Sequence, residues 1–250
     1  MKFVDCHCHI ADNYFFKNIE QFIEEWKASN VTKVCAMATN LKTSNRNLEL
    51  VTRYPEFFTA SAGRHPWGAH KFTEIEQINF EKICNNSKIK IIGEIGLDYY
   101  FVKEKEKYIK QKEVFAYFLT LANKLKKPIM LNLTGAEEDI YEALTTHKMK
   151  VNICCHWYSG SEKTLQKLID LGCYFSINPK FLGSRNHRNV LSFIPKNRIL
   201  TESDGPLKIG SDRGSPSLMP FLCEKIAEEI RVKTVDIADQ IYSNFQEYLQ

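Results

Sequence analysis

The sequence predicts one α/β domain folded as a TIM (β/α)8 barrel, and three observations support this prediction. The chain has 250 residues, a length at which such barrels commonly form a single domain. Short apolar segments alternate with longer amphipathic ones, as in parallel strands joined by helices. No linker, internal repeat or low-complexity stretch divides residues 1–250. A doubly wound open sheet is the alternative, but no glycine-rich phosphate loop follows the first strand.

Eight segments have the length and composition of strands. Apolar residues dominate them, and the run at residues 89–95 is typical of a parallel strand buried on both faces. The expected strands lie, in chain order, within residues 1–10 and at residues 31–37, 56–62, 89–95, 129–133, 151–155, 173–177 and 198–202.

Amphipathic segments separate these strands. In residues 18–29, for example, Ile19, Ile23 and Trp26 recur at helical spacing. Pro55 and Pro128 mark the ends of two helices, because proline cannot continue the helical hydrogen bonding. Helices are expected at residues 18–29, 44–54, 74–85, 105–126, 136–147, 161–171 and 184–193. The Lys- and Glu-rich stretch 102–112 is interpreted as a solvated helix start, with a nucleic-acid contact as the alternative.

The composition is that of an ordinary globular protein, with 44% hydrophobic and 26% charged residues. No apolar run is long enough to span a membrane, and no signal segment opens the chain, so we expect a cytoplasmic protein without membrane contact. The eight cysteines are scattered, and several lie in apolar strand-like runs, which indicates buried thiols. The net charge of +4 allows a polyanionic partner without requiring one. The oligomeric state is left open.

The strongest local pattern lies at the first strand. Side chains two apart share one face of a strand, so Asp5, His7 and His9 are expected to point one way and Cys6 and Cys8 the other. Two imidazoles on one face can bind the same metal ion. A structural role for the histidines is the alternative, and core packing is expected for the two cysteines.

Further polar residues end the other predicted strands. Barrel enzymes place their chemistry at the carboxyl ends of the strands, and apolar runs that end in His, Glu or Asp put costly groups at that rim. We therefore expect a metal centre there, in which Glu94 bridges two ions and Asp204 binds metal and takes a proton from water. A buried salt bridge is the alternative for Glu94, and a turn cap is the alternative for Asp204. The residues that would form this ring are His7, His9, His65, Glu94, Asn132, His156 and Asp204.

Five motifs spread over the chain carry a family resemblance. They are Phe3-Val4-Asp5-Cys6-His7-Cys8-His9, Gly63-Arg64-His65-Pro66, Gly93-Glu94-Ile95-Gly96-Leu97-Asp98-Tyr99, Cys155-His156-Trp157-Tyr158-Ser159-Gly160 and Leu200-Thr201-Glu202-Ser203-Asp204-Gly205-Pro206. In these motifs the chain resembles the TatD family of metal-dependent deoxyribonucleases, within the amidohydrolase-like metallohydrolases. The resemblance implies a TIM barrel, a divalent metal centre and phosphodiester hydrolysis, often by an exonuclease.

The resemblance also implies how the ligands are shared. A first metal would be bound by His7, His9, Glu94 and Asp204. A second would be bound by Glu94, His156 and the residue that ends the fifth strand. The family usually has histidine there, whereas this chain has Asn132. An amide oxygen is a weaker ligand than imidazole, so we expect one tight site and a weaker second site. Mg²⁺ or Mn²⁺ is the expected metal, with Zn²⁺ as a further candidate.

The leading functional prediction is a metal-dependent deoxyribonuclease that acts on DNA as an exonuclease. Asp204 would orient or deprotonate the metal-bound water, and Glu94 would act with it as a catalytic carboxylate that bridges the metals. His65 with Arg64 would bind the phosphate. Tyr99, Tyr100 and Trp157 would stack on bases, although loop packing is equally expected for each. An ion pair is the alternative for Arg64. Because some TatD-like proteins occur in Qat-type phage-defence operons, other proteins of such an operon are candidate partners.

Two other functions stay open. The same centre would suit hydrolysis of an aminoacyl ester or a cyclic amide. Cyclic amidases commonly use a carbamylated lysine at the end of the fourth strand, where this chain has Glu94, which favours the phosphodiesterase. The third hypothesis is a catalytically weakened subunit that binds nucleic acid within a defence complex. Asn132 is the feature that points to it.

Overall fold

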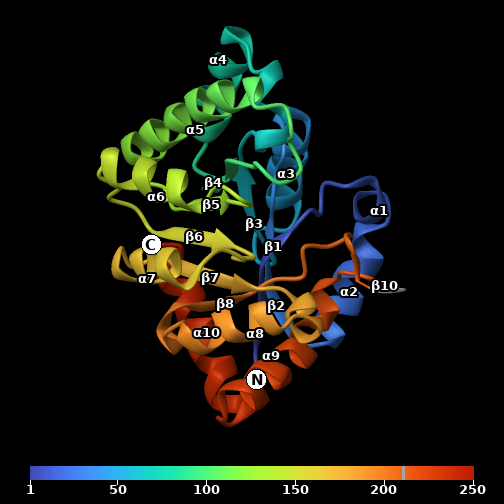
Figure 1. Cartoon of the computed structure of the whole chain (residues 1–250). Helices are drawn as coiled ribbons and strands as arrows, with labels where there is room; N and C mark the ends of the chain where they lie inside the picture. The colour runs from blue at the N-terminus through green and yellow to red at the C-terminus, as the bar shows by residue number, and fades with distance from the viewer. Residues whose placement is uncertain (210–211) are drawn as a thin grey trace.

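The computed structural model describes residues 1–209 and 212–250, and its centre is a barrel of eight parallel strands (Figure 1). Each strand pairs with the next one in the chain, in the order β1 to β8. The strands are β1 (Phe3–Cys8), β2 (Val31–Ala36), β3 (Phe58–Ala62), β4 (Ile89–Gly96), β5 (Ile129–Asn132), β6 (Ile153–His156), β7 (Tyr174–Ile177) and β8 (Ile199–Thr201). The predicted TIM (β/α)8 barrel is therefore observed.

Side-chain and loop contacts bring the last strand beside the first. Thr201 Oγ1 donates to the Val4 carbonyl at 2.8 Å, and the Asp204 N–H donates to the His7 carbonyl at 3.0 Å. Buried Asp5 adds a further link, because its Oδ1 accepts from the N–H groups of His7 and Ser203. These bonds nearly close the barrel, and they place the end of β1 against the loop after β8.

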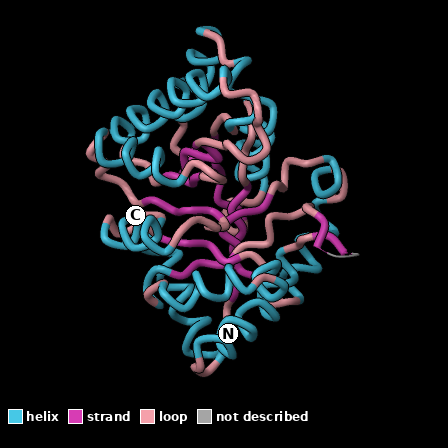
Figure 2. The backbone as a smooth tube through the Cα atoms, in the orientation of Figure 1, coloured by secondary structure: helices cyan, strands magenta, loops and turns pink. Residues whose placement is uncertain are grey.

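Helices cover the outside of the strands (Figure 2). Side-chain caps fix several helix starts, as where Asn40 and Thr43 form a capping box or where Ser161 and Ser184 accept from the first turn. The α-helices are α1 (Asn13–Phe16), α2 (Ile19–Ala28), α3 (Leu41–Arg53), α4 (Glu74–Cys84), α5 (Glu106–Leu125), α6 (Glu137–Thr146), α7 (Glu162–Asp170), α8 (Arg185–Phe193), α9 (Met219–Ile230) and α10 (Thr234–Tyr248).

The remaining elements are short and lie in the connections. Two 3₁₀ helices follow strands at the carboxyl end of the barrel, η1 after β3 and η2 after β7, and neither was predicted. These elements are η1 (Pro66–Lys71), η2 (Pro179–Gly183), η3 (Lys196–Arg198), η4 (Pro216–Leu218) and the antiparallel pair β9 (Lys208–Ile209) and β10 (Asp212–Arg213). Over the described residues, no helix combines the length and apolar character needed to cross a bilayer. The cytoplasmic location stays a prediction.

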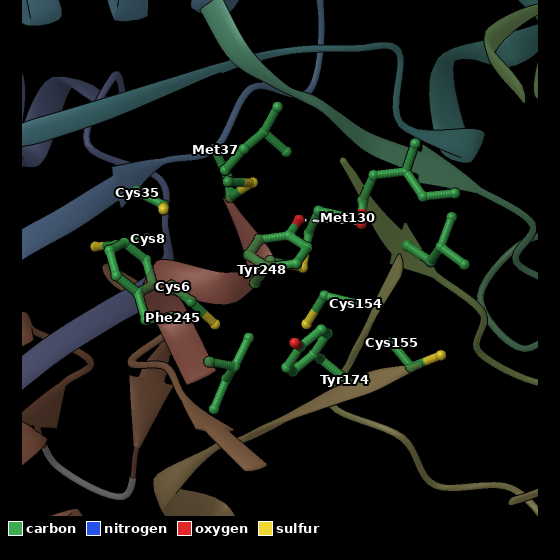
Figure 3. Close-up of a cluster of buried hydrophobic side chains, with 14 of the residues drawn as sticks. Cys6, Cys8, Cys35, Met37, Met130, Cys154, Cys155, Tyr174, Phe245 and Tyr248 are labelled. Carbon is green, nitrogen blue, oxygen red and sulfur yellow. Dashed lines mark hydrogen bonds between the residues drawn. The ribbon is translucent and has the colours of Figure 1, made fainter. Parts of the chain in front are cut away.

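Thiols and aromatic rings fill part of the barrel interior. Figure 3 shows Cys6, Cys35 and Cys154 in one cluster with Met130 and Tyr248. Tyr248 is fully buried, and its hydroxyl donates to the Ile129 carbonyl at 3.0 Å, so α10 packs against the start of β5. The eight cysteines are buried and free, as predicted, and Cys6 and Cys8 belong to the hydrophobic core. The barrel is thus a packed core that leaves chemistry to its rim.

Candidate metal centre

Four side chains converge at the carboxyl end of the barrel. His7 and His9 come from the end of β1, Glu94 from β4 and Asp204 from the loop after β8. Glu94 Oε2 lies 3.4 Å from His7 Nε2 and 3.6 Å from His9 Nε2. Asp204 Oδ1 lies 3.7 Å and 3.3 Å from the same two nitrogens. The His-x-His pattern therefore brings both imidazoles to one face, as alternation along a strand predicts.

His65 extends this group on the far side of Glu94. Its Nε2 lies 3.4 Å from Glu94 Oε1, the oxygen that does not face His7 and His9. Burial raises the pKa of the Glu94 carboxyl, but the imidazoles of His65 and His7 outweigh burial and hold that pKa well below its usual range. Glu94 is thus a buried carboxylate between two histidine groups, a position suited to bridging.

His156 lies beside His7 at the end of β6. The two rings stack with their centroids 3.8 Å apart. His156 Nδ1 donates to Glu202 Oε2 at 2.6 Å, which leaves Nε2 on the side of Asp204, 4.0 Å from Oδ2. Burial lowers the pKa of His156, but the Glu202 carboxylate more than offsets it and raises that pKa to about 10.

Glu202 lies directly behind His156, a contact that was not predicted from the sequence. Its carboxylate is fully buried and also accepts from Ser176 Oγ and, at 3.3 Å, from Asn178 Nδ2. A carboxylate behind a ligand histidine fixes its tautomer and raises its basicity. The sequence Glu202-Ser203-Asp204 could have indicated this residue, because it places two carboxylates two residues apart after an apolar strand.

Asn132 lies at the predicted place, at the end of β5 and on the cavity wall. Its Nδ2 donates to the Leu97 carbonyl at 2.9 Å, so its amide oxygen is the atom it can offer to a metal. Gly96 pairs with Asn132 across the sheet and has φ = +138°. A side chain at Gly96 would overlap the Asn132 carbonyl, so glycine is required for this close approach.

Two residues of the centre have left-handed backbone. Asp204 has φ = +49°, which aspartate tolerates, and Trp157 has φ = +43°, which is rare for a bulky side chain. That conformation costs an L-residue about 1–2 kcal/mol, and it persists where the surroundings impose it. In Trp157 it accompanies an indole on the wall of the cavity.

The centre opens into a cavity of about 1060 Å³. One wall carries three exposed aromatic residues, Trp67, Tyr100 and Phe101, which we call the aromatic wall. Buried Asp98 holds it, because its carboxylate accepts from the Trp67 indole at 2.7 Å and from the N–H groups of Tyr100 and Phe101. Across the cavity, after β6 and β7, which lie three strands further round the barrel than β3 and β4, the lining residues are Trp157, Ser159, Lys180 and His187.

For two candidate substrate-binding residues, Tyr99 and Arg64, the contact observed is the alternative that the sequence left open. Tyr99 does not line the cavity, because its hydroxyl donates to Asp139 and its ring stacks on Tyr108 at 4.0 Å. Tyr100, also a candidate from the sequence, lines the cavity together with Phe101, which was not one. Arg64 does line the cavity, but its guanidinium is paired with Glu76, so the ion pair that was its alternative is the contact observed. Trp157 and His65 lie on the cavity wall.

The whole chain matches a known family. Residues 4–250 fit the family described as TatD related DNase. The chain belongs to this family. An uncharacterized metal-dependent hydrolase of Methanocaldococcus jannaschii is 32% identical over 247 residues, covering 98% of this chain and 95% of that protein. A protein of Edwardsiella piscicida named 3'-5' ssDNA/RNA exonuclease TatD is 25% identical over 236 residues, covering 90% of each. The crystal structure of a TatD homologue from Escherichia coli superimposes with a TM-score of 0.92 at 21% identity, over 98% of this chain and 97% of that one.

Membership of the TatD family makes this chain a metal-dependent hydrolase, and its residues fit a metal. Ligand atoms of His7, His9 and Asp204 lie within 4.8 Å of one another, as do those of His7, His156 and Glu202. Imidazole nitrogens and carboxylate oxygens that face one point, with little protein hydrogen bonding among them, are the donor set of a divalent transition metal or Mg²⁺. The first set fits better, because Glu202 is already occupied by His156, Ser176 and Asn178.

Proposed function

We propose that this protein is a divalent-metal-dependent deoxyribonuclease that hydrolyses phosphodiester bonds at the end of a DNA strand. The observation that carries the proposal is the convergence of His7, His9, Glu94 and Asp204 at the base of a cavity lined by aromatic rings. Such a cavity suits a nucleotide, which needs a charged centre for its phosphate and a flat surface for its base. The name of the Edwardsiella piscicida relative, a 3'-5' ssDNA/RNA exonuclease, supports it.

The four converging residues would hold the first metal, with Mg²⁺ or Mn²⁺ as the leading candidates and Zn²⁺ as a third. A second ion would take Glu94, His156 and the amide oxygen of Asn132, and would bind more weakly. When bound, a divalent ion lowers the pKa of water and offsets charge on phosphoryl oxygens.

The protein side chains supply the remaining steps. Asp204 Oδ2 faces the side of His156 and accepts the proton of the attacking water. His65 Nδ1 accepts from the Trp67 N–H, so the ring N–H is at Nε2, 3.4 Å from Glu94 Oε1. When Glu94 binds the metal, this N–H would turn to a phosphate oxygen in the cavity that His65 lines. The base at the strand end stacks on the aromatic wall. DNA is the proposed partner, and proteins of a defence operon stay a prediction.

End-labelled single-stranded and duplex DNA tests this function. Purified protein loaded with Mn²⁺ or Mg²⁺ is expected to shorten the strand by single nucleotides, and labels at either end report the polarity. Glu94→Gln keeps the side-chain volume but removes the charge, so we expect its rate to fall by more than about 100-fold, because loss of a residue behind a ligand alone costs 10–100-fold. Glu113→Gln, exposed on α5, is the matched control and should keep full activity.

The same assay separates the other functions. Hydrolysis of an aminoacyl ester or a cyclic amide without DNA cleavage would favour the carbon ester or amide hydrolase. Binding of DNA without cleavage at any metal concentration would favour the weakened binding subunit.

A further inference from the structure

Two residues with permanent positive charge line the cavity, and they differ in their partners. The Arg64 guanidinium is almost fully buried and paired with Glu76. Lys180 is half-buried on the opposite side, and no carboxylate of the described residues lies within 4.0 Å of its ammonium. Arg64 is therefore neutralised by protein, whereas Lys180 presents its charge to the cavity.

Lys180 is held in place from two sides. Its Nζ lies 5.0 Å from the centroid of the Trp157 ring, a distance at which an ammonium is attracted to the indole face. The backbone N–H of Lys180 donates to Asn178 Oδ1 at 3.0 Å, and Asn178 Nδ2 donates to Glu202. The segment that carries Lys180 is thus tied to the carboxylate that orients His156, and the ammonium is positioned relative to the metal ligands.

Two further positive charges follow Lys180 in the chain, outside the cavity lining. Arg185 and Arg188 are exposed on α8, the helix after η2, and neither makes an ion pair with another described residue. Asn186 of the same helix donates to the Ser159 carbonyl at 3.2 Å, which joins α8 to the loop that carries Trp157. We call Lys180, Arg185 and Arg188 the basic side. The aromatic wall has one cation beside it, because Lys103 Nζ lies 4.7 Å from the centroid of the Tyr100 ring. Lys103 is exposed and does not line the cavity, whereas Lys180 does, so within the cavity the unpaired charge and the aromatic rings suit different parts of one ligand.

We propose that Lys180 binds the backbone phosphate next to the scissile phosphodiester, on the part of the strand that stays bound after cleavage. The retained strand lies over the basic side, and the base of the departing terminal nucleotide lies on the aromatic wall. A partly desolvated ammonium without a carboxylate partner favours an anion, and a nucleic-acid strand supplies a row of them. This inference rests on the proposed nuclease function.

The test compares variants that differ in charge alone. Lys180→Met keeps the aliphatic stem against Trp157 and removes the ammonium, while Lys180→Arg keeps a charge. Lys150→Met removes an exposed ammonium before β6, at the opposite end of the barrel. Affinity of the Mn²⁺-loaded proteins for a phosphorothioate oligonucleotide, which resists hydrolysis, is measured by fluorescence anisotropy between about 50 and 200 mM salt. Rates are measured with single-stranded DNA and with bis(p-nitrophenyl) phosphate, which has no neighbouring phosphate.

We expect Lys180→Met to weaken oligonucleotide binding about tenfold, as loss of one charge-assisted contact does. The slope of log affinity against log salt should fall in magnitude by about 0.7, the value for one contact to a single strand. Lys180→Arg and Lys150→Met should keep the wild-type slope. The rate loss with DNA should exceed the loss with bis(p-nitrophenyl) phosphate by about tenfold.

An unchanged salt slope in Lys180→Met, or equal losses with both substrates, would overturn the inference while leaving the nuclease proposal intact. A wild-type protein that binds the oligonucleotide through Lys180 but cleaves neither substrate would sink the nuclease proposal and support the phosphate contact. Absence of oligonucleotide binding would overturn both.

Discussion

At the scale of single residues, Asn132 is where this chain departs from the ligand set that the family resemblance implies. Its Nδ2 donates to the Leu97 carbonyl, so an amide oxygen stands where the resemblance implies an imidazole nitrogen. Histidine at this position can keep the bond to Leu97 through one ring N–H and offer the other nitrogen to a metal. On the proposed ligand sets, the second ion would lack one imidazole ligand, which a single substitution would supply.

We predict that Asn132→His lowers the apparent dissociation constant of the second ion by roughly tenfold and leaves the first unchanged. Calorimetric titration with Mn²⁺ measures both steps, and the cleavage rate at limiting Mn²⁺ should rise if the second ion assists the leaving oxygen. Asn86→His, at the opposite end of β4, is the matched control. Two equally tight sites in the unchanged protein would show that Asn132 serves without penalty.

The residues that could be predicted from the sequence are those on regular strands. Alternation fixes the side to which His7 and His9 point, and strand ends place Glu94 and His156. Alternation predicts side-chain direction only within a strand, and both Tyr99 and Tyr100 follow the end of β4. The sequence therefore could not show which of the two tyrosines lines the cavity. Lys180 lies in a 3₁₀ turn after β7 and faces Trp157 from a separate strand end, a contact that no local pattern encodes.

At the scale of elements, the contact between β4 and β5 positions two ligands at once. Gly96 pairs with Asn132 in the sheet, and Glu94 lies two residues before it. The apolar runs predicted where β4 and β5 lie in the sequence. They did not predict the close approach of Gly96 to the Asn132 backbone, because that contact depends on the register between the two strands. A side chain at Gly96 would have both a positive φ and an overlap with backbone against it.

We predict that Gly96→Ala lowers the free energy of unfolding by more than about 3 kcal/mol, because neither the φ nor the overlap can relax without moving β5. Gly183→Ala is the control, since a side chain there meets nothing within 4 Å, and it should change stability by less than about 0.5 kcal/mol. Urea unfolding followed by circular dichroism measures both. Equal stability of the two variants would contradict this account of Gly96.

At the scale of the whole molecule, the centre joins distant parts of the chain. His7 and His9 come from the first strand, Glu94 from the fourth and Asp204 from beyond the eighth, so its ligands meet only when the barrel closes. The alternation of strands and helices predicted that barrel because parallel strands bring their carboxyl ends to one rim. A metal bound by residues from three separate strand ends binds the folded chain and not the unfolded one.

We therefore predict that Mn²⁺ stabilises the fold. At a free concentration about 100 times the dissociation constant, binding to the native state adds about 2.7 kcal/mol, which for a chain of this size raises the Tm by about 5–10 °C. Thermal unfolding of protein treated with EDTA and then supplied with Mn²⁺ measures the shift. Glu94→Gln should lose most of it, whereas Glu113→Gln should keep it, because Glu113 is exposed on α5 away from the ligands. An equal shift in Glu94→Gln would mean that the stabilising ion binds elsewhere, and the metal centre assigned to His7, His9, Glu94 and Asp204 would be refuted.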